Sequence, residues 1–308
     1  MLGFPHVIPL PAPVHDRLDA VTAGFLTDAG VTFDFTMPQG EPALVSADSM
    51  SWRIFKNQVA LFIGGVTAVL LEMAEPKVRD GVWQHSSFRT QPLKRLQRTG
   101  LAAMVTVYGA RSRAEAMIAG VVKAHDHVTG VTSEGEDYHA NDPVLLDWVQ
   151  ATAGFGFMEV YHAYVRPLSQ AERDSLFFEA GPAARLYGAA GAPTSQLEWD
   201  ALLDAMKDRL APSPIIFEFL DIMKRVDALP QIANPLQVAL VKAAVELLPD
   251  WVKTRLSIGP HYRLSRRERL AVTLAAKAAD RLLLKSSPPV QACRRLGLPD
   301  DYLYRKPH

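Results

Sequence analysis

Apolar residues recur along most of the chain at intervals of three and four positions, the spacing that is typical of amphipathic helices. Four Ser-x-x-Glu segments, starting at Ser112, Ser169, Ser195 and Ser265, each precede such a stretch. This pattern predicts a capping box, in which the serine and the glutamate each bond to the other's backbone at a helix start. The pattern predicts helices over 14–29, 47–56, 57–74, 92–103, 112–129, 142–165, 169–188, 195–209, 213–226, 234–248 and 265–285.

Strand signals are few. The alternating segment 31–36 is the best strand candidate, and 104–108 is a weaker one. The sequence shows no internal repeat and no linker, and the proline-rich stretch after residue 287 is typical of a surface tail. We therefore predict a mainly α protein with a single domain over 1–308. Its core covers about 47–285, with the N- and C-terminal segments packed around it.

The composition excludes several classes of function and binding site. Of 308 residues, 48% are hydrophobic, so a large core can form. Lysine and arginine total 33, as do aspartate and glutamate, which argues against a nucleic-acid partner because that affinity needs a basic field. The single cysteine, Cys293, excludes an intrachain disulfide and a cysteine-held zinc or iron–sulfur site.

No segment predicts a membrane span or a signal peptide. The longest apolar run, 59–71, is shorter than the roughly 20 residues of a span and is typical of a buried helix. The first sixteen residues lack a basic n-region and are interrupted by four prolines. We therefore expect a cytoplasmic protein without a transmembrane segment.

Common catalytic motifs are missing from the sequence. It contains no Gly-x-Ser-x-Gly elbow, no His-Glu-x-x-His and no P-loop. Gly154-Phe-Gly156 lacks the third glycine and the preceding strand of a dinucleotide site. The basic run 263–269 is interpreted as a solvated helix start.

His125 and His127 are two positions apart and point to nearly opposite sides of a helix, so they cannot bind one metal together. His125 continues an apolar stripe and therefore points inward, whereas His127 shares the polar side. The stripe comprises Ile118, Val121, Val122 and Val128. An inward histidine is more often a hydrogen-bonded core residue than a ligand, so both interpretations stay open.

Arg95, Arg98 and Thr99 share one face of a predicted helix. Two guanidinium groups and a hydroxyl in this arrangement suit a carboxylate or a phosphate, although a solvated basic face is the alternative.

Two Glu-x-x-His pairs offer a competing chemistry. Glu159 with His162 and Glu136 with His139 have the spacing that supplies ligands in di-iron helical bundles. Glu136 lies in a segment rich in turn residues, which weakens this hypothesis because a bundle site needs both pairs on helices.

Several segments, in order, resemble the family of the oxygenase MpaB and the bacterial rubber oxygenase, or latex clearing protein. Together they cover most of the chain. The matching segments are Leu61–Pro76, Val82–Phe88, Pro92–Thr99, His125–Gly130, Tyr138–Trp148 and Pro167–Asp174.

The resemblance implies a globin-like helical core that holds haem b. It implies that His125 is the proximal iron ligand and that Arg95 and Thr99 belong to the haem-pocket motif. Arg98 stands where relatives carry a lysine that can cap the iron. Because arginine has no lone pair to give, we expect Arg98 to donate a hydrogen bond to dioxygen instead. Glu75 stands where many relatives have histidine, and a carboxylate buried there could act as a base.

These implications predict a haem-b-dependent oxygenase that activates dioxygen to oxidise or cleave an apolar, isoprenoid-like substrate. Three alternatives stay open: a haem-binding sensor or carrier without turnover, a di-iron oxidase that uses the Glu-x-x-His pairs, and a helical protein that has lost its cofactor.

Overall fold

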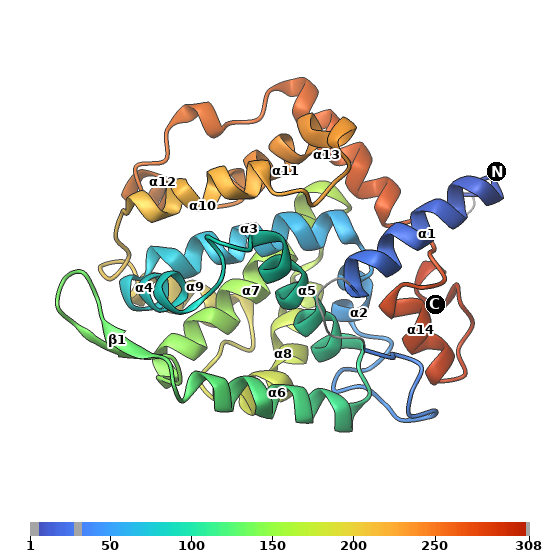
Figure 1. Cartoon of the computed structure of the whole chain (residues 1–308), viewed down its shortest axis with the longest axis horizontal. Helices are drawn as coiled ribbons and strands as arrows, with labels where there is room; N and C mark the ends of the chain where they lie inside the picture. The colour runs from blue at the N-terminus through green and yellow to red at the C-terminus, as the bar shows by residue number, and fades with distance from the viewer. Residues whose placement is uncertain (1–5, 28–32, 306–308) are drawn as a thin grey trace.

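A computed structural model describes residues 6–27 and 33–305, which are mainly helical (Figure 1). The mainly α prediction is therefore confirmed. The α-helices in these residues are α1 (Ala12–Thr27), α2 (Met50–Phe55), α3 (Gln58–Ala74), α4 (Pro76–His85), α5 (Pro92–Tyr108), α6 (Arg111–His125), α7 (Pro143–Tyr164), α8 (Gln170–Tyr187), α9 (Gln196–Ala205), α10 (Pro214–Arg225), α11 (Asn234–Glu246), α12 (Asp250–Arg255), α13 (Arg266–Ala279) and α14 (Pro288–Arg295).

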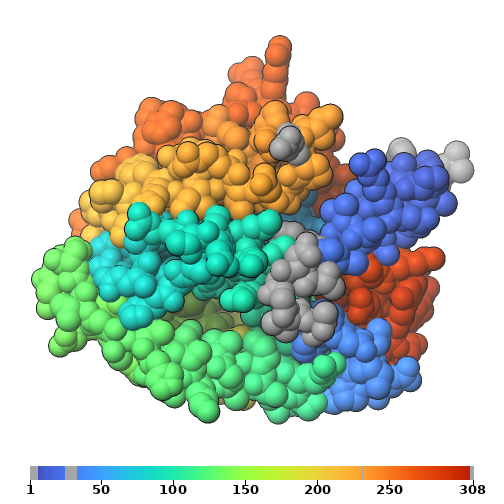
Figure 2. Space-filling model, in the orientation of Figure 1, coloured from blue at the N-terminus to red at the C-terminus, as the bar shows by residue number. Residues whose placement is uncertain are grey.

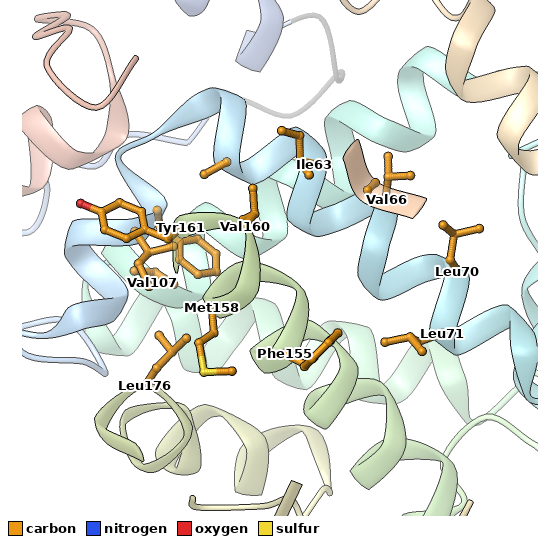
Figure 3. Packing of buried hydrophobic residues seen from close by; sticks show 14 of the residues in the cluster. Ile63, Val66, Leu70, Leu71, Val107, Phe155, Met158, Val160, Tyr161 and Leu176 are labelled. Carbon is orange, nitrogen blue, oxygen red and sulfur yellow. The ribbon is translucent and has the colours of Figure 1, made fainter. Parts of the chain in front are cut away.

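The centre of the fold is the pair α3 and α7, which pack along each other. Glycines let their backbones meet, because a Cβ on Gly156 would lie 2.4 Å from the Gly64 carbonyl oxygen. Figure 3 shows the apolar side chains that fill this pair, including Leu70 of α3 and Phe155 of α7. Phe155 also stacks on Trp199 of α9, with ring centroids 4.7 Å apart.

Other helices surround this pair. α10, α11 and α13 pack against α3, while α8 packs against α7 and also contacts α2 and α6. α5 pairs with α6, which runs along the lower edge of the molecule in Figure 1. The two short strands β1 (Thr129–Val131) and β2 (Asp137–His139) pair antiparallel and connect α6 to α7.

Both strand candidates are wrong where the structure describes them. Phe33–Thr36 form no strand, and residues 31–32 lie outside the described residues. Residues 104–108 belong to α5, because Leu101, Met104, Val105 and Tyr108 are buried at helical spacing. The short β1–β2 hairpin was not predicted.

Two of the four predicted capping boxes are confirmed, at Ser169 and Ser265. Ser195 caps α9, but the Glu198 carboxylate accepts hydrogen bonds from Thr194 instead of Ser195. Ser112 is not an N-cap, because α6 begins one residue earlier and the Ser112 N–H donates to Glu41. That prediction is therefore wrong.

Three helices were not predicted: α4, α12 and α14. The polar sequence of α4 hides its periodicity, although Glu75 caps it and Pro76 starts it. α14 lies in the predicted surface tail, yet Val290 and Cys293 are buried in the core.

None of the helices in the described residues is long and apolar enough by itself to cross a membrane. The bent pair α3 and α4, which meet at 111°, passes that test together on length and composition.

Candidate functional site

One face of α3, beside its contact with α7, is left partly open. Leu61, Gly65, Val69 and Glu72 recur along this open face and are each partly accessible. A Cβ built on Gly65 meets no atom within 4 Å. Figure 2 shows the molecular surface hollowed between α5 and α6. Arg95 of α5 acts on the charges of both Glu72 of α3 and His125 of α6, so these three helices approach one another in a region that a ligand could enter.

Glu72 is the most perturbed acid of this region. Burial raises the pKa of its carboxyl to about 7, while the nearby Arg95 and a hydrogen bond with Thr152 act in the opposite direction. The side chain is partly accessible and at the same time enclosed by protein, as expected for a group that lines an interior hollow. Both protonation states of Glu72 are therefore populated near neutral pH.

Arg95 reaches the same region from α5. Burial lowers the pKa of its guanidinium, Glu72 counteracts this effect, and Arg98 reinforces it. Arg95 Nη1 donates to Thr99 Oγ1, which in turn donates to the Arg95 carbonyl oxygen at 2.8 Å. The prediction that Arg95 and Thr99 share one helix face is confirmed. Within the described chain Arg95 forms no ion pair, so its charge is available to a further anion.

His125 is the last residue of α6, and its ring points inward as predicted. Its Nδ1 is buried, whereas His127 is exposed. Burial lowers the pKa of His125, while the side chain of Asn141 opposes that shift and Arg95 adds to it. The predicted helix to residue 129 is too long, because the chain leaves α6 at Asp126 and enters the hairpin. His125 and Arg95 therefore lie near each other although they come from different helices.

Arg98 and Thr99 are more exposed than Arg95. Arg98 is close enough to Arg95 to lower the pKa of that guanidinium, and it has an interaction of its own. The structure therefore brings the four predicted residues, Arg95, Arg98, Thr99 and His125, to one side of the molecule, on α5 and α6.

Both carboxylate oxygens of Glu75 form interactions that stabilise the fold. One of its carboxylate oxygens accepts the Val78 N–H at 2.8 Å, and the other binds Arg209 Nη2 at 2.7 Å. Its side chain is 2% exposed. The interpretation of Glu75 as a base is therefore not supported, and the carboxylate that faces the hollow is Glu72.

The two Glu-x-x-His pairs do not assemble. Glu159 binds Arg173 at 2.7 Å, and the Nδ1 atom of its partner His162 accepts the Leu168 N–H at 2.9 Å. Glu136 lies at the start of the hairpin's second strand, outside any helix. Among the residues that the structure describes, no three histidine, cysteine or acidic side chains are grouped to hold a metal ion. The described residues therefore do not bring together the ligands that the di-iron hypothesis requires.

Glu72 and Asn141 were missed by the sequence-based prediction. A usable signal existed for Glu72, since it is the one carboxylate inside an otherwise apolar helical segment between Leu71 and Met73. Nothing comparable marks Asn141, whose relevance depends on how the hairpin returns toward α6.

Comparison with known protein families identifies a match over most of the chain. The family model described as "ER-bound oxygenase mpaB/B'/Rubber oxygenase, catalytic domain" matches residues 52–281. No curated protein and no solved structure matches the chain significantly. The matched range contains Glu72, Arg95, Arg98, His125 and all of α3, α5, α6 and α7.

Proposed function

Because the chain belongs to the family of mpaB-type and rubber-oxygenase catalytic domains, we propose that it is a haem-dependent oxygenase that acts on an apolar substrate. The observation that supports this proposal is that a histidine, an arginine without an ion pair in the described residues, and a carboxylate lie around one hollow. These groups are His125, Arg95 and Glu72.

The donor set fits haem b. Iron needs a neutral imidazole, and burial favours the neutral form of His125 by lowering its pKa. Haem carries two propionates, and Arg95 offers a guanidinium that forms no ion pair in the described residues. The porphyrin ring needs an apolar wall, which Leu61, Gly65 and Val69 provide on the open face of α3. These groups support haem b as the proposed cofactor.

When bound, haem supplies the redox chemistry of dioxygen activation. His125 would hold the iron, and Arg95 would bind and orient a propionate. Glu72, with a pKa of about 7, can take a proton from the substrate side and return it at neutral pH. Arg98 is proposed to donate a hydrogen bond to dioxygen. The apolar face of α3 would exclude water from the substrate.

The experiment that tests this function measures oxygen consumption by the haem-loaded protein with an isoprenoid alkene, together with detection of carbonyl products. The proposal expects uptake that depends on the alkene and falls at least about a hundredfold in Glu72→Gln, the size typical of losing a proton-transfer group. The matched control is Glu136→Gln, which changes a carboxylate on the hairpin. A carrier would bind dioxygen without consuming it, and that result would contradict turnover.

Arg98→Ala tests the proposed donor separately. We expect weaker dioxygen affinity and slower uptake, because a hydrogen-bond donor is removed. Unchanged affinity and unchanged uptake would contradict this role for Arg98.

A further inference from the structure

Two buried polar atoms beside α6 lack hydrogen-bond partners in the described chain: Nδ1 of His125 and Oδ1 of Asn141. An unpaired buried polar atom is costly, and the Asn141 side chain lies close enough to His125 to act on its pKa, so the two atoms together call for an explanation. One is a ring nitrogen that can carry a proton, and the other is an amide oxygen that can only accept one. The two atoms are chemically complementary.

The position of Asn141 is fixed by α6 itself. Its Nδ2 donates to the Val122 carbonyl oxygen at 3.0 Å and to Asp126 Oδ1 at 2.7 Å. Val122 lies one turn before His125, and Asp126 follows it directly, so the amide is anchored on both sides of the histidine. Because both Nδ2 bonds go to acceptors, the orientation of the amide is determined, and Oδ1 is the atom left for the imidazole.

We infer that Asn141 is a positioning residue, whose Oδ1 accepts the proton of His125 Nδ1 and thereby leaves the lone pair on Nε2. The bond fixes both the tautomer and the rotation of the ring. An outer hydrogen bond of this kind orients a metal-binding histidine and makes it a better donor. The inference rests on the proposed function only in naming haem iron as the partner of Nε2.

The tautomer is measured without cofactor, by nitrogen NMR of the haem-free protein labelled in its histidines. We expect His125 to carry its proton on Nδ1 in the wild type and to lose this preference in Asn141→Ala. Asn141→Asp keeps an acceptor oxygen but loses the Nδ2 donor that anchors the side chain to Val122 and Asp126, so it is expected to weaken this preference as well. Asn234→Ala, at the start of α11, is the matched control. A proton found on Nε2 in the wild type, or an unchanged tautomer in Asn141→Ala, would overturn the inference.

Haem titration gives the second readout. Loss of an outer hydrogen bond typically weakens metal binding by about 10–100-fold, and we expect this range for Asn141→Ala. Should Asn141→Ala fail to fold, Asp126→Ala removes one anchor of the amide and leaves Asn141 in place, with a smaller loss expected. If the wild type shows the Nδ1–H tautomer but binds no haem, the proposed function fails while the positioning role stands.

A different observation concerns the solvent side of α13. Leu270 and Leu274 are 61% and 59% exposed, although they belong to a helix that buries Val272 and Ala276 on its opposite side. The α13 outer face is defined by five positions that share one side of the helix: Arg266, Arg267, Leu270, Leu274 and Lys277.

The acidic residues in α13 and at its C-terminal end do not neutralise the α13 outer face. Glu268 binds Lys242 at 2.6 Å, and Asp280 binds Lys56 at 2.7 Å, both toward the body of the protein. Among the described residues, the three cations of the α13 outer face form no ion pair. The face therefore combines exposed leucines with uncompensated positive charge.

We propose that the α13 outer face binds an anionic membrane surface. Leucines between cations suit the boundary of headgroups and acyl chains, where lipid phosphates pair with arginine and lysine. A nucleic acid would use the cations but not the leucines.

Sedimentation of the full-length protein with vesicles tests this proposal. We expect binding to vesicles of phosphatidylcholine mixed with phosphatidylglycerol, weaker binding to phosphatidylcholine alone, and loss of binding in high salt. Leu270→Ser with Leu274→Ser should abolish binding. Each of Arg266→Gln and Arg267→Gln should weaken it about fivefold. Leu197→Ser, at a 78% exposed leucine of α9, is the control. No binding by the wild type, or binding that survives the leucine changes, would overturn the proposal.

Discussion

Two neighbouring faces of α3 serve different purposes. Toward α7, the helix carries small and apolar residues, and Gly64 meets Gly156 backbone to backbone. On the neighbouring face, the same helix carries Glu72, which lies near Arg95 of α5 and Thr152 of α7, and a glycine with open space around it. The first face stabilises the fold through close packing, whereas the second leaves a charged group partly buried, at a cost in stability. This difference is typical of a rigid scaffold with a functional site on one side.

The largest effect is expected in the tight face. Gly156→Ala places a methyl group 2.4 Å from the Gly64 carbonyl oxygen, and both neighbours are backbone, so the helices must separate. We expect a loss of about 1–3 kcal/mol in the free energy of unfolding, measured in urea. Gly120→Ala on α6, where a Cβ meets nothing within 4 Å, should instead be neutral or stabilising by up to about 1 kcal/mol. Equal midpoints for both variants would contradict the account of this face.

The open face should respond to pH through Glu72. The fold raises the pKa of this carboxyl from 4.5 to about 7, so the folded protein holds the proton more tightly than the unfolded chain. Its contribution is therefore favourable below pH 4.5 and is lost as the pH rises to about 7. Glu72→Gln should make the haem-free protein about 1–3 kcal/mol more stable than the wild type at pH 8. Urea unfolding across this pH range measures the difference, and parallel profiles would contradict it.

A smaller effect concerns Arg95, whose positive charge lowers the pKa of Glu72. In Arg95→Gln, the pKa of Glu72 should rise further, so the loss of stability should occur at higher pH than in the wild type. The double variant with Glu72→Gln should show no such shift, which assigns the effect to this pair. The outcome that contradicts coupling is an identical pH midpoint with and without Arg95.

The smallest effect on stability is expected when serines near the starts of two helices are replaced. Ser169 caps α8, which packs on α7, and Ser169→Ala should cost about 1 kcal/mol. Ser112 lies inside α6 and caps nothing, and its hydroxyl donates only to Glu41 at an exposed position, so Ser112→Ala should stay within about 0.5 kcal/mol. Urea midpoints give the comparison, and a larger loss at Ser112 would contradict it.

Local patterns in the sequence predicted the helices that carry clear apolar periodicity, as well as the inward direction of His125. They failed where local and tertiary signals differ. Residues 104–108 have strand-forming side chains, but burial at helical spacing keeps them in α5. Likewise Ser112 has the capping-box spacing, but Glu41 from a distant segment takes its N–H.

The candidate site was predictable only in part. Arg95, Arg98 and Thr99 follow one another on a single helix, so their shared face is visible in the sequence. Glu72 and Asn141 depend on long-range folding, because the environment of Glu72 comes from α5 and α7, and Asn141 reaches α6 through the hairpin. Spacing along the chain does not encode such contacts.

The most direct measurement is an absorption spectrum of protein purified with a supply of haem, before and after reduction with dithionite. The wild type is compared with His125→Ala and with His127→Ala, which changes the exposed neighbour. Our account predicts a strong Soret band in the wild type and in His127→Ala, and its loss in His125→Ala. A wild-type protein without a Soret band, or a band unchanged in His125→Ala, would contradict it.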